Sequence, residues 1–172
     1  MVVDAPVAGF TAQALAGTGV ALRAVAPSDA ALIASLYATT REEELRVVPW
    51  SGEQKRAFTD WQSGLQEEHY RRHYAGAERL VIERDGEAIG RIYVHVTGAE
   101  VRLMDVTLLA AHRGQGIGTR LVRALIAHAD GLARPCSLHV EPFNPARRLY
   151  QRLGFATREV RGLYEFMVRA PS

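Results

Sequence analysis

The sequence has one cysteine and one lysine among its 172 residues. A single thiol, Cys136, allows no disulfide within the chain, which is typical of a protein from a reducing compartment. Its neighbours in the segment PCSLHV are mostly apolar, so we expect a buried core residue rather than a nucleophile. Positive charge comes almost entirely from arginines spread among Asp and Glu, and the net charge is only +2. This pattern argues against a nucleic-acid partner.

Long hydrophobic runs and metal-ligand spacings are also missing. No apolar run approaches the roughly 18–20 residues that cross a bilayer, so no membrane partner is expected. His, Cys and carboxylates show no ligand spacing, so no metal is expected either. The first 19 residues lack the positively charged start of a secretory signal, and we interpret residues 1–19 as a flexible tail. Residues 20–172 fit one cytoplasmic globular domain.

The apolar patterning predicts an α/β chain. Strands are expected at residues 20–26, 78–84, 87–97, 100–109, 136–141, 155–162 and 163–170. A first helix is expected from the caps at 27–29 to about Arg41, and a second begins at Ser51 and has an apolar face of Phe58, Trp61, Leu65 and Tyr70. A third helix follows Gly114, Gly116 and Gly118 and has a stripe of Ile117, Leu121, Leu125 and Leu132. A fourth is expected from Asn144 to Gly154. Strands 78–84, 87–97 and 100–109 form an antiparallel meander, and a crossover helix makes strand 136–141 parallel to the preceding one.

Three glycines alternate with other residues in the segment HRGQGIGTRL, residues 112–121. Unpaired N–H groups at a helix start attract phosphate, and glycine lets an anion approach closely, so this loop is a candidate pyrophosphate cradle. A triphosphate-binding Walker A loop needs a lysine, and none is near. A dinucleotide fold needs a wider glycine spacing and an opening strand. A tight turn without a ligand remains the simpler alternative.

Two segments carry a family resemblance. Residues 113–118, RGQGIG, look like the [QR]-x-x-G-x-[GA] signature of the GCN5-related N-acetyltransferases (GNAT). Residues 144–155, NPARRLYQRLGF, resemble that family's N-x-x-A-x-x-L-Y-x-x-x-G-F segment, although alanine comes one residue early. The resemblance implies a mixed, mostly antiparallel sheet of about 6–7 strands flanked by about 4 helices, with the fourth and fifth strands splayed apart.

The resemblance also implies acetyl-CoA as co-substrate. Its pyrophosphate would lie on the loop amides, and its pantetheine arm would run along the main chain of the fourth strand. The residues expected to hold it are Val106, Leu108, Leu109, Arg113, Gly114, Gln115, Gly116, Ile117, Gly118, Thr119, Asn144 and Tyr150.

Amine acetylation needs a neutral nucleophile and a proton for the departing thiolate. Tyr150 matches the family's tyrosine general acid. Glu100 stands where some members have a general base, and Asp105 is the other candidate because an acid inside the apolar run RLMDVTLL is unusual. Asp105 is alternatively expected to pair with an arginine such as Arg102.

The acceptor is expected to be an amine of a small molecule or peptide. Family acceptor sites lie mostly on the first two helices, the loop between them and the final hairpin. Candidate residues are Glu42, Glu43, Glu44, Trp50, His69, Tyr70 and Tyr74, together with His139 and Glu141, which share one face of their strand. The resemblance implies a homodimer paired through sheet edges or the last strands. The rival functions are an acyl-CoA sensor without turnover and a nucleotide-binding module.

Overall fold

The computed structural model describes residues 15–172 and contains one seven-stranded sheet in the order β1-β2-β3-β4-β5-β7-β6. The strands are β1 (Val20–Ala24), β2 (Glu78–Arg84), β3 (Glu87–Val96), β4 (Val101–Leu108), β5 (Cys136–Val140), β6 (Ala156–Arg161) and β7 (Tyr164–Arg169). The α-helices are α2 (Ala30–Arg46), α3 (Gly52–His73), α4 (Ile117–Gly131) and α5 (Ala146–Arg152), and short 3-10 turns lie at Pro27–Asp29 and Ala110–His112. The predicted architecture is confirmed.

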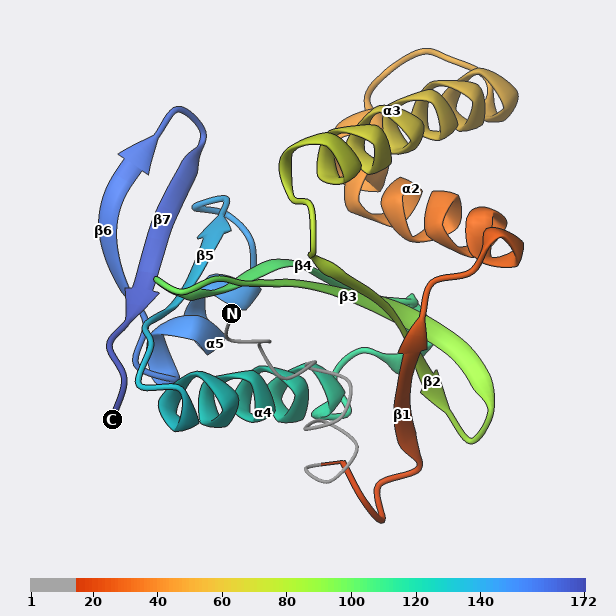
Figure 1. Ribbon diagram of the computed structural model, residues 1–172. Helices are drawn as coiled ribbons and strands as arrows, with labels where there is room; N and C mark the ends of the chain where they lie inside the picture. The colour runs from red at the N-terminus through yellow and green to blue at the C-terminus, as the bar shows by residue number, and fades with distance from the viewer. Residues whose placement is uncertain (1–14) are drawn as a thin grey trace.

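Strands β4 and β5 form the single parallel pair of the described sheet, and every other neighbouring pair is antiparallel. The β4–β5 ladder joins only Val101, Arg102 and Leu103 to residues 136–138, whereas β4 continues to Leu108. The two strands therefore separate after Leu103, as Figure 1 shows near the middle of the sheet. The predicted splay of the fourth and fifth strands is confirmed.

Helices cover both faces of the sheet. Figure 1 shows α2 and α3 on one face, called here the α3 face, and α4 and α5 on the other, the α4 face. The main apolar core lies on the α4 face, where Leu121 and Leu125 of α4 pack against strand residues such as Ile92 and Leu138. The β6–β7 hairpin rises on the same side of the sheet as α3. The α3 face of β4 and β5 thus lies between the α2–α3 helices and the β6–β7 hairpin.

A β-bulge at Met104 changes which face the residues of β4 occupy. Tyr93 of β3 pairs with Asp105, but the next residue of β3 pairs with Leu103, so Met104 is an extra residue in the strand. Strict alternation would put Asp105 on the core side with Leu103. The bulge turns Asp105 to the α3 face and lets Val106 pack on the core instead.

Several predicted boundaries differ from the structure. β1 ends at Ala24, α2 continues to Arg46, and Leu132 caps α4 rather than lying within it. Residues 15–19 of the predicted tail form a turn, with Leu15 buried in the core, and residues 1–14 lie outside the described residues.

The apolar face predicted for α3 packs on the sheet only in part, because Tyr70 contacts Tyr93 of β3 whereas Trp61 and Leu65 do not turn inward. Trp61 is 61% exposed and Leu65 53% exposed, whereas the buried positions of this helix are Thr59 and Ser63. Hydrophobicity alone suggested the opposite orientation. The reason is that the side of α3 facing the sheet meets a buried charge, Arg91, and must therefore be polar.

Other local expectations hold. Asp85 and Gly86 form the predicted hairpin with both residues in the left-handed region, which is typical of such two-residue turns. Cys136 is a free, fully buried thiol, and burial raises its pKa to about 12. In residues 15–172, no helix has both the length and the apolar character needed to span a membrane.

Candidate active site

The glycine loop ends β4 and starts α4. Gly114 and Gly116 have φ angles of 71° and 79°, and Gly116 is the residue that precedes the first helical residue, Ile117. Both angles lie in the left-handed region that side-chain-bearing residues rarely adopt. The backbone N–H groups at the start of α4 are therefore presented by a loop that two glycines make possible.

Gly118 has a different role, because its backbone is helical and needs no glycine. A Cβ added at Gly118 would meet no protein atom within 4 Å. Neither local conformation nor packing within residues 15–172 thus explains this glycine. The absence of a side chain keeps the surface of the first helical turn open, as close approach by an anion requires.

Two side chains of the loop brace it rather than point away from it. Arg113 donates from Nε to the carbonyl of Leu108 at 2.8 Å and from Nη2 to Thr39 Oγ1 at 3.0 Å. Gln115 donates to the carbonyl of Ala111 at 2.9 Å and accepts a hydrogen bond from Arg84. These contacts fasten the loop to β4, α2 and β2 through side chains. The N–H of Arg113 donates to the carbonyl of Ala110, so the main-chain amides from Gly114 onward are the ones placed to bind a ligand.

The far half of β4 offers a free main-chain edge. In the described residues, Met104 to Leu108 have no ladder partner on the β5 side, although β3 pairs with Asp105 to Leu108 on the other side. Val106 and Leu108 pack against the core, and Leu109 donates its N–H to the carbonyl of Ile89. The side chains of Val106 and Leu108 are therefore structural, and the main chain of this segment is the part placed to bind an extended ligand arm.

Tyr150 lies on α5, which begins at Ala146, two residues after the predicted asparagine. Asn144 Oδ1 accepts a hydrogen bond from the N–H of Ala146 at 2.9 Å and so caps the helix. The Tyr150 ring is buried, with its centroid 5.9 Å from that of Phe155. Burial, and secondly the charge of Asp105, raise the pKa of Tyr150 to about 12. The phenol is therefore protonated at neutral pH.

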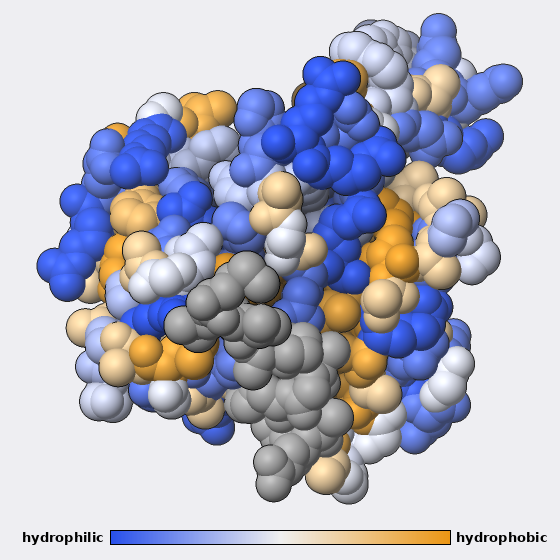
Figure 2. Space-filling view, viewed as in Figure 1, coloured by the Kyte–Doolittle hydropathy of each residue, from blue (hydrophilic) through white to orange (hydrophobic). Residues whose placement is uncertain are grey.

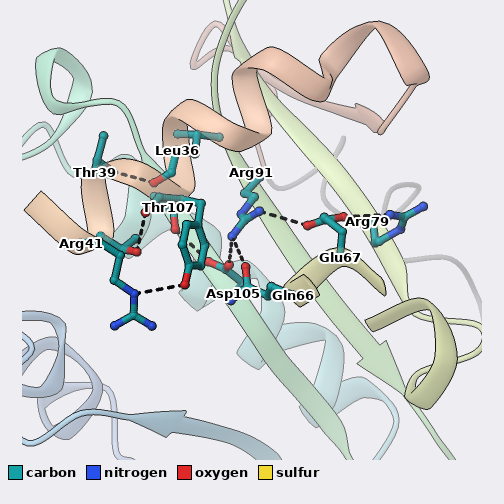
Figure 3. A network of polar contacts seen from close by, with 11 residues as sticks. Leu36, Thr39, Arg41, Gln66, Glu67, Arg79, Arg91, Asp105 and Thr107 are labelled. Carbon is teal, nitrogen blue, oxygen red and sulfur yellow. Dashed lines mark hydrogen bonds and ion pairs between the residues drawn. The ribbon is translucent and has the colours of Figure 1, made fainter. Parts of the chain in front are cut away.

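Asp105 pairs with Arg91 and not with Arg102, so the predicted partner is wrong. Arg91 Nη2 donates to Asp105 Oδ2 at 2.5 Å, and Thr107 Oγ1 donates to Asp105 Oδ1 at 2.8 Å (Figure 3). Arg102 turns instead to Glu100, at 2.6 Å. The bulge explains the difference, because it moves Asp105 beside the β3 residues that face α3.

Arg91 links Asp105 to α3. It donates to Gln66 at 2.8 Å and to Glu67 at 3.1 Å, and Glu67 also accepts from Arg79 (Figure 3). Burial opposes its charge, but Asp105, Tyr93 and Glu67 raise the pKa of the Arg91 guanidinium above its usual value.

Sequence reasoning did not identify Arg91, which is 1% exposed. A charged residue inside the apolar strand segment IGRIYVHV was the available signal.

Glu100 lies in a second group of residues at the other end of β4. Five residues of strand, about 15 Å, separate it from Asp105. Its partner Arg102 lies over the ring of Phe166, which also stacks against His139 with 4.9 Å between ring centroids. Burial, followed by the charges of Arg102 and Arg161, lowers the pKa of His139. Glu141 follows β5 and accepts the N–H of Asn144 through its carbonyl.

Aromatic side chains gather at the C-terminal end of α3. The Tyr70 ring packs edge-on against Tyr93 of β3 at 5.7 Å, and Tyr74 packs against His95 at 5.5 Å. His69 contacts the rings of Tyr70 and Tyr74. Tyr93 is also the cross-strand neighbour of Asp105, so this group lies toward that carboxylate. Burial, and secondly the charge of Asp105, raise the pKa of Tyr70.

The remaining acceptor candidates are not brought to this group. Trp50 precedes α3, and twenty helical residues, about 30 Å, separate it from Tyr70. Glu42 and Glu43 line a groove between α2 and the first turns of α3. Glu44 pairs with Arg41 on the surface. Within residues 15–172, no group of three or more His, Cys, Asp or Glu is arranged to hold a metal ion.

Comparison with known proteins agrees with this geometry. The model of the acetyltransferase (GNAT) family matches residues 33–155, which include the glycine loop, the splayed strands and Tyr150. The chain belongs to the GNAT family. Acetyl-CoA is the co-substrate of this family, and the resemblance predicted from residues 113–118 and 144–155 is confirmed.

Individual GNAT relatives are more distant. Glucosamine 6-phosphate N-acetyltransferase 1 of Oryza sativa subsp. japonica is 32% identical over 102 residues, covering 52% of this chain and 61% of that protein. The chain thus spans less than two thirds of this curated relative.

Solved structures show the same fold. The PaiA N-acetyltransferase of Thermoplasma acidophilum, in complex with coenzyme A, has a TM-score of 0.64 at 17% identity, over 88% of this chain and 98% of that one. The YncA protein of Salmonella typhimurium, with acetyl-CoA, has a TM-score of 0.55 at 22% identity, over 90% of this chain and 95% of that one.

Proposed function

We propose that this GNAT protein transfers an acetyl group from acetyl-CoA to a primary amine by direct attack of the amine on the thioester. The observation that carries the proposal is the separation of β4 from β5 after Leu103, with the glycine loop at one end and Tyr150 close by. The pyrophosphate would bind the amides of residues 114–119, and the pantetheine arm would pair with the free edge of β4. The thioester would then lie near the Met104 bulge.

Tyr150 is the proposed general acid. As the C–N bond forms and the C–S bond breaks, the departing thiolate takes a proton from the Tyr150 hydroxyl. A phenol with its pKa raised to about 12 stays protonated across the physiological range and can always supply that proton. Asn144 supports it by capping α5 and is proposed to contact the cofactor arm as well.

Asp105 is the proposed acceptor of the amine's proton, in preference to Glu100. It lies on the α3 face beside Tyr70, at the point where the strands separate, whereas Glu100 is held by Arg102 about 15 Å along the strand. Each Asp105 oxygen accepts one hydrogen bond, from Arg91 or Thr107, and a carboxylate oxygen has room for a second. The amine would use that remaining position, on the side of Tyr70 and Tyr74.

A release assay for free thiol tests this proposal. The protein is given acetyl-CoA and a panel of primary amines that includes amino sugars, glucosamine 6-phosphate, polyamines and peptides. Tyr150→Phe should lower kcat by about 100-fold or more while acetyl-CoA affinity stays unchanged. Tyr164→Phe, on the exposed surface of β7, is the matched control and should leave kcat unchanged.

An acyl-CoA sensor is the second candidate, favoured by the engagement of both Asp105 oxygens within the protein. It predicts an acetyl-CoA-dependent rise in Tm with no thiol release for any amine. A Tm that acetyl-CoA leaves unchanged would contradict both functions.

A further inference from the structure

Strands β4 to β7 bring basic and aromatic side chains together beside the hairpin. At the centre is Phe166 of β7, and the ring of its cross-strand neighbour His139 lies at 4.9 Å between centroids. The guanidinium carbon of Arg102, from β4, lies 5.8 Å from the centre of the Phe166 ring, and that of Arg161, from β6, lies 4.8 Å from it. We call Arg102, His139, Arg161 and Phe166 the hairpin cluster.

The hairpin cluster lies on the α3 face, as Asp105 does. Both neighbours of Arg102 along β4, and both neighbours of His139 along β5, belong to the core on the α4 face, so alternation turns Arg102 and His139 the other way. In Figure 1 the α2–α3 helices and the β6–β7 hairpin stand on either side of the α3 face. Figure 2 shows mainly hydrophilic residues on the hairpin and on the end of α3 nearest to it. A charged acceptor would therefore meet polar groups on both sides.

The acidic neighbours of the two arginines use only part of their hydrogen-bonding capacity. Arg102 contacts Glu100 through Nη2 at 2.6 Å. Arg161 contacts Glu159 through Nη2 at 2.8 Å, and both side chains of this pair are about half exposed, so the pair is weak. A guanidinium carries more N–H donors than one carboxylate oxygen accepts. An anion with several oxygens can therefore bind both arginines beside these pairs or in place of them.

Two polar atoms at the base of the hairpin cluster lack partners. Ser137 is the cross-strand neighbour of Arg102 in β5 and is fully buried. Neither its hydroxyl nor Arg102 Nε has a hydrogen-bond partner within residues 15–172, and both atoms are shielded from solvent. Buried polar groups are nearly always hydrogen-bonded, and both of these can donate. The base of the cluster therefore calls for a further oxygen atom, from water or from a ligand.

The electrostatic field at the hairpin cluster is positive. Burial, followed by the charges of Arg102 and Arg161, lowers the pKa of His139. Glu100 and Glu159 act on His139 in the opposite direction, but more weakly than the arginines. The two ion pairs thus leave an excess of positive potential beside the His139 ring, which favours an anion there.

We propose that the hairpin cluster binds an anionic group of the acceptor, a carboxylate or a phosphate, while the amine of the same molecule reaches Asp105. This inference rests on the proposed function and adds the chemical class of the acceptor. Arg102 would form the main ion pair with the anion, and Arg161 would contact it from the hairpin. Glu100 occupies Arg102 until the anion arrives and so competes with it.

The spacing of the two groups sets the length of the acceptor. Arg102 precedes Asp105 by three residues in β4, on the order of 10 Å along the strand. An α-amino acid, whose amine and carboxylate are attached to one carbon, is too short to span this separation. Amino sugar phosphates and ω-amino acids have the required length.

Paired acceptors test the class in the thiol-release assay. Glucosamine 6-phosphate is compared with glucosamine, and ε-aminocaproate with its amide, so that the members of each pair differ in the anion. We expect kcat/KM to be about tenfold higher or more for the anionic member of at least one pair. A response of the sugar pair alone assigns a phosphate, and a response of the aminocaproate pair alone assigns a carboxylate. Equal kcat/KM within both pairs would overturn the proposal.

Variants at two residues should have opposite effects. Arg102→Gln should raise KM for the preferred anionic acceptor about tenfold, with little change for the neutral member of the pair. Glu100→Gln should lower KM for the anionic acceptor, because it removes the competing carboxylate. Arg158→Gln, at an exposed arginine of β6 outside the cluster, is the matched control and should leave both KM values unchanged. The Tm of each variant reports whether it folds. An equal loss for both members of a pair in Arg102→Gln would contradict an anion site.

Calorimetry separates this inference from the proposed function. The two anionic acceptors are titrated into the CoA complexes of the native chain and of Arg102→Gln, where no acetyl group is present to transfer. Binding that Arg102→Gln weakens, together with no thiol release from any amine, would refute acetyl transfer and leave the anion site in place. Thiol release from neutral amines, with no binding preference for either anionic acceptor, would leave acetyl transfer in place and refute the anion site.

Discussion

Arg91 and Asp105 form an ion pair across β3 and β4, with 2.5 Å between Nη2 and Oδ2. The arginine is 1% exposed, and its other contacts reach Gln66 and Glu67 of α3. One guanidinium therefore holds the carboxylate beside the strand separation and also fixes the helix that carries Tyr70. Stability and the geometry of the candidate site depend on the same side chain.

Replacement of Arg91 by methionine should lower the free energy of unfolding by about 3–5 kcal/mol, because it leaves the Asp105 carboxylate without its charged partner and removes one of the two arginines that Glu67 contacts. Urea unfolding measures the change. Arg158→Met, at an exposed position of β6, is the control, and its free energy of unfolding should stay within about 0.5 kcal/mol of that of the native chain. A loss below about 1 kcal/mol for Arg91→Met would mean that water reaches the pair freely.

Two alanine substitutions in the glycine loop should have opposite effects on stability. Gly116→Ala should destabilise the protein by about 1 kcal/mol because of its left-handed φ. Gly118→Ala should leave the Tm unchanged or higher, since it improves the helix without a clash. Gly118→Ala should nevertheless weaken acetyl-CoA binding by about tenfold, measured by calorimetry, if the pyrophosphate approaches this turn. Unchanged affinity would contradict the placement.

The raised pKa of Tyr150 makes two predictions at high pH. If it is the acid, kcat should show no loss from its ionisation until about pH 12, whereas an ordinary tyrosine would ionise near pH 10. The same shift affects folding: the folded state keeps the proton that the unfolded chain loses, so stability falls as pH rises from about 10 to 12. Tyr150→Phe should make the decline in unfolding free energy over that window shallower. A decline as steep as in the native chain would refute the assignment.

Asp29 should contribute to the loss of stability at acid pH. Hydrogen bonds from Arg23, and then from the N–H of Ala26, lower the pKa of Asp29 from 3.8 to about 2. A lowered pKa contributes stability above about pH 4, and that contribution is lost as pH falls through 2. Asp29→Asn should therefore reduce stability at neutral pH, and its stability should depend less on pH between 4 and 2 than that of the native chain. Thermal unfolding at each pH measures both effects. An unchanged acid slope would rule out this carboxylate as its source.

Much of the fold was predictable because the signals are local. The runs rich in Val, Ile and Leu in β2, β3 and β4, and the Asp85–Gly86 turn, specify a meander with little help from distant contacts. The glycine loop and the Asn144 cap likewise depend on backbone conformation within a few residues. Such features are visible in the sequence because each residue type has a local reason to be there.

The orientation of α3 and the partner of Asp105 were not predictable in the same way. Both depend on the bulge at Met104, and no residue type in the segment RLMDVTLL predicts an extra residue in the strand ladder. Once Asp105 turns to the α3 face, Arg91 becomes its partner and Glu67 is needed on the inner side of the helix. The apolar residues of α3 then have to lie outside, contrary to what hydrophobic periodicity suggests.

The bulge also limits how β4 can change in length. Deleting Met104 alone would remove the bulge and leave Leu103 next to Asp105, so Asp105 would still face α3 and Val106 would still face the core. Deleting a paired residue such as Val106 would instead exchange the faces of the residues that follow it. Relatives can therefore lose the residue at position 104 and keep both the apolar core and the carboxylate, whereas the loss of a paired residue would change one or the other.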